Sequence, residues 1–130
     1  MSKPVLAAFF AVLAAPALAA TPDTRINAEL MKLSPEARRE QRCDGRAMGQ
    51  VSRDHAGMQP DSIIAYAYGD PKAQGNRIVA PGGAIHIGTM WYHISYSCQT
   101  TDDGLDIQSF TYNLGKPIPK GEWAEHQLVQ

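Results

Sequence analysis

The stretch WYHISYSC, residues 91–98, decides the fold, because apolar and polar side chains alternate along most of it. This period of two is typical of a strand that buries one of its faces. Gly88-Thr89, just before the stretch, suits a two-residue hairpin turn with glycine in the first position. Such a turn sets His86 opposite Trp91 on an antiparallel neighbour. The stretch therefore predicts a strand over residues 90–99 within an antiparallel sheet.

The remaining strands of this sheet are expected wherever branched and aromatic residues recur between turn signals. We expect them at residues 63–68, 76–80, 84–87 and 106–114. The sequence Pro81-Gly82-Gly83 is interpreted as a turn between two of these strands. Matching apolar to apolar residues across the second hairpin pairs Tyr96 with Phe110. One buried sheet face then carries Tyr92, Ile94, Tyr96 and Cys98.

Helices are expected before the sheet, because apolar residues recur there at intervals of three and four. Ser34-Pro35-Glu36 is a helix-start signal that combines a capping hydroxyl, an early proline and an acid. Further on, Asp44 could cap a separate short helix. The sequence thus predicts an α+β fold with two or three N-terminal helices packed on one face of a four- to five-stranded, mostly antiparallel sheet. A short C-terminal helix carrying Trp123 is expected within residues 117–130.

The chain has two cysteines, Cys43 and Cys98. Cys43 shares a helical apolar stripe with Ala47 and Val51, which follow it at intervals of four. The helical and strand periodicities together place both sulfur atoms in the layer between helices and sheet. An oxidising compartment favours joining them, so we predict a disulfide between Cys43 and Cys98. Neither cysteine belongs to a C-x-x-C motif, which leaves thiol-redox catalysis without local support.

The N-terminus has the three-part pattern of a secretory signal peptide. Lys3 precedes an apolar run, and the small-residue sequence Ala17-Leu18-Ala19 ends it. We expect cleavage after Ala19, which leaves a single domain over residues 20–130. The apolar run is shorter than the roughly 20 residues of a membrane span, so no stable membrane anchor is expected after cleavage. The predicted location is periplasmic or secreted.

Charge argues against a nucleic-acid partner, because the formal net charge of the chain is −1. Basic residues crowd one stretch, yet acids are interleaved with them along it. We interpret this stretch as a solvated helix face with local ion pairs. The basic residues are Arg38, Arg39, Arg42 and Arg46, with Glu36 just before them and Glu40 and Asp44 between them.

The candidate binding surface consists of Trp91, His86 and His93, which share the polar face of the sheet. We expect Trp91 to be exposed beside the two imidazoles. Exposed aromatics flanked by hydrogen-bonding groups are common in surfaces that bind sugars, peptides or another subunit. His86 and His93 could be two ligands of zinc or copper, but the pattern provides no third ligand. We therefore expect neither a metal nor another cofactor.

Catalysis has little support in the sequence. Ser95 and His93 lie on one strand, but the acids that could orient the histidine are at the far turn. The nucleophile motif G-x-S-x-G does not occur. We therefore expect no catalytic residue. The favoured function is a non-catalytic periplasmic binding or interaction module for an unknown envelope protein or small ligand, and the alternative is a small cell-envelope hydrolase or an inhibitor of one.

The motifs LSPE (residues 33–36), EQRCD (40–44) and WYHISYSC (91–98) resemble a bacterial family, the domain of unknown function 930. The resemblance spans nearly the whole chain after the predicted signal peptide. It implies an envelope or exported protein of Gram-negative bacteria, and it assigns no activity, ligand or catalytic residue. It also supports pairing the two cysteines, since each lies inside a motif. The chain departs from the family pattern at Gly45 and Gly49, which leaves the extent of this helix open.

Overall fold

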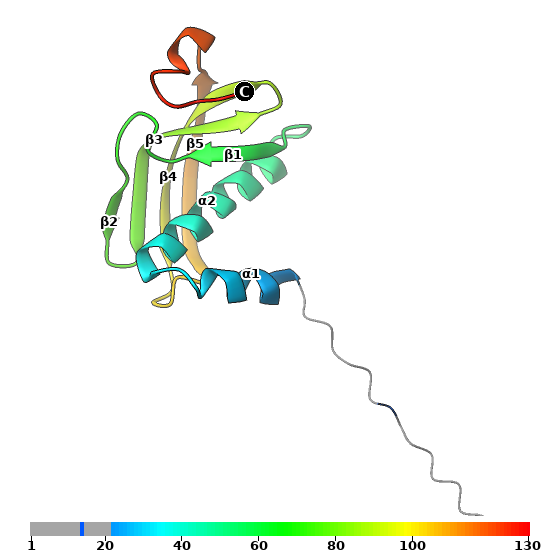
Figure 1. Ribbon diagram of the computed structural model, residues 1–130, viewed down its shortest axis with the longest axis vertical. Coiled ribbons are helices and arrows are strands. Elements are labelled where there is room, and N and C mark those ends of the chain that lie inside the picture. Colours follow the sequence, from blue (N-terminus) through cyan, green and yellow to red (C-terminus); the bar gives the residue numbers. More distant parts are fainter. Residues whose placement is uncertain (1–13, 15–21) are drawn as a thin grey trace, which may run out of the picture.

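The computed structural model describes Ala14 and residues 22–130 of the chain (Figure 1). Apart from Ala14, the predicted signal peptide, residues 1–19, lies outside the described residues. Within the described part, the fold is α+β, as the sequence predicts, and no helix there is long and apolar enough to cross a bilayer. The elements are α1 (Pro22–Leu30), α2 (Pro35–Asp54), β1 (Pro60–Ile64), β2 (Lys72–Gln74), β3 (Arg77–Ile87), β4 (Met90–Thr100), β5 (Ile107–Pro117) and the 3-10 turn η1 (Lys120–Glu122).

Helix α2 begins where the sequence signal places it. The Ser34 hydroxyl accepts a hydrogen bond from the Ala37 backbone N–H at 3.2 Å, and Pro35 occupies the first turn. The helix then runs without a break through Gly45 and Gly49 to Asp54. Tertiary packing of its apolar stripe therefore outweighs the low helix propensity of glycine, and no separate third helix forms.

The sheet is antiparallel throughout, with strand order β1-β3-β4-β5 and with β2 paired to β3 as well. Strand β3 is long enough for β2 and β1 to pair successively along the same edge. The predicted hairpin between β3 and β4 is confirmed, because His86 pairs with Trp91 and Gly88 has the positive φ of 64° that such a turn requires.

The predicted turn at residues 81–83 is wrong. These residues form a bulge inside β3, where the register with β4 shifts between Ala80 and Gly83. Glycine is required at position 82, because an ideal Cβ there would lie 2.8 Å from the backbone carbon of Tyr68. The Tyr68 N–H also donates to the Gly82 carbonyl at 2.8 Å. Figure 1 shows β3 changing direction between its two halves.

The second hairpin is shifted by two residues from the predicted register. Tyr96 pairs with Tyr112, and Cys98 pairs with Phe110. A shift by an even number keeps every side chain on its predicted face, so apolar matching alone cannot distinguish the two registers. The loop distinguishes them, since the Thr101 N–H donates to the Asp106 carbonyl at 2.9 Å and closes it.

The main core lies between α2 and one face of the sheet, and it contains the predicted disulfide. Cys43 and Cys98 are bonded, with 6.0 Å between their Cα atoms, and both are fully buried. Helix α1 contributes nothing to this core, and Ile26 on it is 48% exposed. The expectation that two or three helices pack on the sheet therefore needs correction, since α2 alone among the described helices does so.

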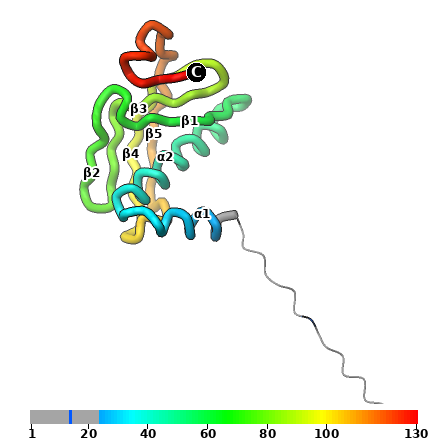
Figure 2. The backbone as a smooth tube through the Cα atoms, viewed as in Figure 1, coloured from blue at the N-terminus to red at the C-terminus, as the bar shows by residue number. Residues whose placement is uncertain are grey.

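A second, smaller core covers part of the opposite face of the sheet. The C-terminal segment, residues 118–130, folds back over this face after β5 (Figure 2). Its Trp123 is buried, and the indole N–H donates to the Ile118 carbonyl at 2.9 Å. The segment holds the 3-10 turn η1 where the sequence suggested a short helix.

Candidate functional site

Trp91 is buried, so the prediction that it is exposed is wrong. Only 2% of its surface is accessible, because Ile118, Trp123 and Leu128 of the C-terminal segment pack around it. Its indole N–H donates to the Val129 carbonyl at 2.8 Å. The strand periodicity assigns Trp91 to the correct face, but that face is covered at this end. Trp91 therefore holds the C-terminal segment in place and is not available as a contact for a ligand.

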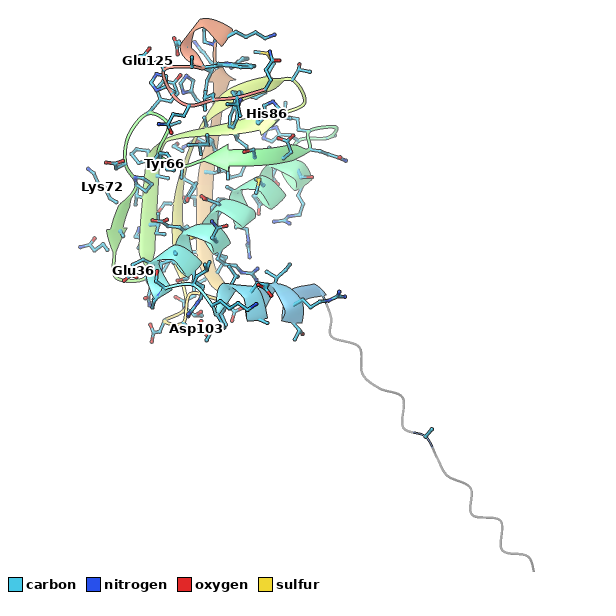
Figure 3. All side chains as sticks on the ribbon, in the orientation of Figure 1. Glu36, Tyr66, Lys72, His86, Asp103 and Glu125 are labelled. Atoms are coloured by element: carbon cyan, nitrogen blue, oxygen red, sulfur yellow. A yellow bond between two sulfur atoms is a disulfide. The ribbon has the colours of Figure 1, made fainter. Side chains whose placement is uncertain are left out.

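His86 and His93 share a sheet face but engage different partners. His86 lies on β3 (Figure 3). Its Nδ1 atom lies 2.6 Å from Oδ1 of Asp61, and its ring centroid lies 5.0 Å from that of Trp91. The His93 ring lies 4.7 Å from the Tyr68 ring. Across residues 22–130, no three histidine, cysteine or acidic side chains are grouped so that they could hold a metal ion.

Tyr68 joins the β1–β2 loop to the C-terminal segment, a link that the sequence did not indicate. Its ring stacks on the His126 ring, with 3.8 Å between the ring centroids, and also contacts the His93 ring. Its hydroxyl donates to Oε2 of Glu122 at 2.8 Å. Burial of the ring and this bond raise the pKa of Tyr68 to about 12. The tyrosine therefore stays neutral and serves to anchor the segment.

A cavity of about 510 Å³ lies between α2, the β1–β2 loop and β4, and we name it the acidic cleft. Helix α2 contributes Glu40 and Asp44, which are one turn apart on the same face. The β1–β2 loop contributes Asp70, and the 58% exposed ring of Tyr66. The complete lining is Glu40, Gln41, Asp44, Ile63, Ala65, Tyr66, Asp70, Pro71 and Tyr96.

Asp44 has the most perturbed carboxyl group of the cleft. Burial raises its pKa to about 6, the hydrogen bond from Tyr96 partly opposes this rise, and the charge of Glu40 adds to it. The Tyr96 hydroxyl donates to Oδ1 of Asp44 at 2.7 Å. Burial beside Asp44 also raises the pKa of Tyr96, so the phenol remains a donor. At neutral pH Asp44 is mostly ionised, although its surroundings favour the neutral acid.

The acidic cleft has no basic group in its lining to balance its three carboxyl groups. The ion pairs of Lys32 with Glu29 and of His86 with Asp61 do not involve the cleft. The carboxyl groups are also too dispersed to ligate one metal ion together. The arrangement can therefore attract an organic cation that carries more than one positively charged group.

The predicted ion pairs along α2 are not formed among the described residues. Arg38 instead donates to the carbonyls of Leu30, Leu33 and Asp103, at 3.1, 3.1 and 2.7 Å. Arg39 donates to Oγ1 of Thr100 at 3.0 Å. These buried arginines tie the start of α2 to the loops around it. Of the acids of α2, Glu40 and Asp44 line the cleft. Their i, i+4 spacing places both on one helix face, but it does not indicate the loop and strand residues that complete the site.

The fold and the cleft define the class: a small α+β domain with one helix disulfide-linked to an antiparallel sheet and an acidic cavity beside that helix. A family model matches residues 30–128, and its description is Domain of Unknown Function (DUF930). The chain belongs to this family, as its motifs indicate. No curated protein and no solved structure matches the chain.

Proposed function

We propose that the protein is a non-catalytic, exported binding module whose acidic cleft takes a small organic cation with two or more amino groups. One observation carries this proposal: three carboxyl groups line one cavity that contains no cationic side chain. The signal-peptide pattern at residues 1–19 supports a periplasmic or secreted location. The Gram-negative origin rests on the family resemblance alone.

The shape and walls of the cleft suit such a ligand. Its volume of about 510 Å³ lies within the usual range for small-molecule sites. Ile63 and Pro71 offer apolar contact to a carbon chain between the amino groups. Tyr66 at the mouth presents an exposed ring to a cation, a contact worth about 0.5–1 kcal/mol.

The test is calorimetric titration of the purified protein with putrescine, a four-carbon diamine, and with the neutral diol of the same length. We expect the diamine to bind and the diol not to bind. Glu40→Gln and Asp70→Asn should each weaken diamine binding by about fivefold, since an exposed charge contact contributes roughly 1 kcal/mol. The control is Glu125→Gln, which removes an exposed acid outside the cleft and should leave the affinity unchanged. Equal affinities of diamine and diol would refute the proposal.

A second candidate function is hydrolysis of a cell-envelope polymer, and the pKa of Asp44 favours it. A carboxyl group with a pKa of about 6 inside a cleft is suited to act as a general acid. The corresponding test is release of soluble fragments from peptidoglycan by the purified protein. Activity that falls as the pH rises through 6, and is lost in Asp44→Asn, would establish the hydrolase in place of the binding module.

A further inference from the structure

A second cavity lies on the other side of α2, between this helix, α1 and the start of β5. Its volume is about 400 Å³, and we name it the arginine groove. An adjoining, mostly apolar cavity of about 550 Å³ lies against α1 and shares Ile26, Leu30 and Gln41 with the groove. Together they give a basic compartment next to a mostly apolar one, whose lining also includes Arg25 and Glu29.

The basic compartment is formed by Arg42, Arg46 and Arg53, and its lining includes no acid. None of the three forms an ion pair within residues 22–130. Arg42 donates through Nε to the Leu105 carbonyl at 2.6 Å, and Arg53 donates to Oε1 of Gln50 at 3.0 Å. The side chain of Arg46 makes no hydrogen bond within residues 22–130. The groove therefore holds guanidinium groups with unused donors.

Glycines keep the groove open. Gly45 and Gly49 lie in the middle of α2, where glycine weakens a helix, and both line the groove. A Cβ atom added at Gly45 would meet no other atom within 4 Å, so the space beside it is open. Larger side chains at these positions would project into the groove. Gly45 and Gly49 therefore lie at positions where a larger side chain would fill the arginine groove.

The apolar compartment leaves hydrophobic side chains accessible to solvent. Ile26 is 48% exposed and Leu33 is 38% exposed, and both line it. Exposed apolar surface next to unpaired guanidinium groups is complementary to a molecule with an acidic head and an apolar chain.

We propose that the arginine groove binds a long-chain alkyl carboxylate. Its carboxylate is held by Arg46 and Arg42, and its alkyl chain lies along Ile26, Leu30 and Leu33. The arginine groove and the acidic cleft have no charged residue in common. A test of one site is therefore independent of a test of the other.

The first test compares three probes by calorimetric titration of the purified protein: dodecanoate, 1-dodecanol and butyrate. Dodecanoate should bind with one molecule per chain. The alcohol lacks the charge and butyrate lacks the chain, so each should bind at least tenfold more weakly. Binding of dodecanol as tight as that of dodecanoate would remove the role of the arginines and overturn the proposal.

The second test uses paired variants. Arg46→Gln should weaken dodecanoate binding at least fivefold, whereas Arg77→Gln, on the exposed surface of β3, should change it less than twofold. Gly45→Leu should abolish binding and raise the melting temperature, because leucine favours the helix while it fills the groove. Gly121→Leu, at another open position, should leave binding unchanged. Since Gly45→Leu is expected to stabilise the fold, lost binding cannot be attributed to unfolding.

One alternative occupant is a second copy of the chain, which would cover the same apolar surface. Gel filtration of the unliganded protein and of Gly45→Leu distinguishes it. A monomer in both cases agrees with the proposal. A dimer that Gly45→Leu converts to a monomer would assign the groove to self-association and overturn the proposal.

Discussion

Asp44 is ionised at neutral pH against the preference of its surroundings. Its pKa in the folded protein, about 6, is higher than its ordinary value of 3.8. The folded state therefore binds this proton more tightly than the unfolded state does. The contribution of Asp44 to stability is greatest below pH 4 and is lost as the pH rises through 6. At pH 7 the ionised side chain costs up to about 3 kcal/mol, because each pKa unit corresponds to about 1.4 kcal/mol. A cation in the cleft would offset this cost.

The first prediction follows from that cost. Asp44→Asn should raise the free energy of unfolding at pH 7.5 by about 1–3 kcal/mol and should have little effect at pH 4. The amide oxygen of asparagine can still accept the Tyr96 hydrogen bond, so the substitution removes the charge and keeps the contact. Urea denaturation at the two pH values measures the difference.

Asp70→Asn is the matched control, because Asp70 lines the same cleft on an exposed loop. It should change stability by less than about 0.5 kcal/mol at either pH. Equal stability curves for Asp44→Asn and the unmodified protein would contradict the burial of a charged Asp44.

At the scale of elements, the C-terminal segment changes the role of the residues beneath it. The backbone N–H of Ile118 donates to the Trp91 carbonyl at 2.7 Å, and Tyr68 holds the middle of the segment through Glu122 and His126. A period of two in the sequence determines which face of a strand a residue occupies. It does not determine what covers that face, which is why the exposure of Trp91 was mispredicted.

The second prediction concerns this cover. Trp123→Ala should lower the free energy of unfolding by about 3–5 kcal/mol, the usual cost of truncating a buried aromatic side chain. The chain has two tryptophans, so the fluorescence of this variant reports on Trp91 alone. Its emission should shift to longer wavelength as water reaches the indole.

Trp123→Phe is the control, since it keeps an aromatic ring in the same cavity and loses the bond to the Ile118 carbonyl together with one ring of the indole. Its stability should fall by a smaller amount than that of Trp123→Ala. If instead Trp91 in Trp123→Ala emits as a fully buried indole and stability is unchanged, the segment is not the cover that we describe.

At the scale of the whole molecule, the sequence predicted what depends on local spacing. The start of α2, the first hairpin and the inward direction of both cysteines follow from spacings of two to four residues. The acidic cleft could not be found in this way. Asp70 comes from a loop and Tyr96 from a strand, and only the folded chain brings them to the two acids of α2. The bulge at Gly82 likewise depends on the approach of Tyr68, a contact that no local pattern encodes.

The disulfide connects these scales, because each of its cysteines is close in sequence to one member of the Asp44–Tyr96 pair. Cys43 precedes Asp44, and Cys98 lies two residues beyond Tyr96 on the same sheet face. The bond closes a loop with a sequence separation of 55 residues. On the loop-entropy model, such a cross-link stabilises the fold by about 4 kcal/mol. It also fixes the distance between the helix and the strand that form the cleft.

The third prediction is that replacing both cysteines by alanine lowers the free energy of unfolding by about 4 kcal/mol and loosens the cleft. The pKa of Asp44, followed by the NMR chemical shift of its carboxyl carbon, should then move from about 6 toward its ordinary value of 3.8, because water enters beside Tyr96. A reducing agent should destabilise the unmodified protein and leave the double variant unaffected. A double variant that loses stability while Asp44 keeps its raised pKa would show that packing around the carboxyl group, and not the cross-link, maintains the cleft.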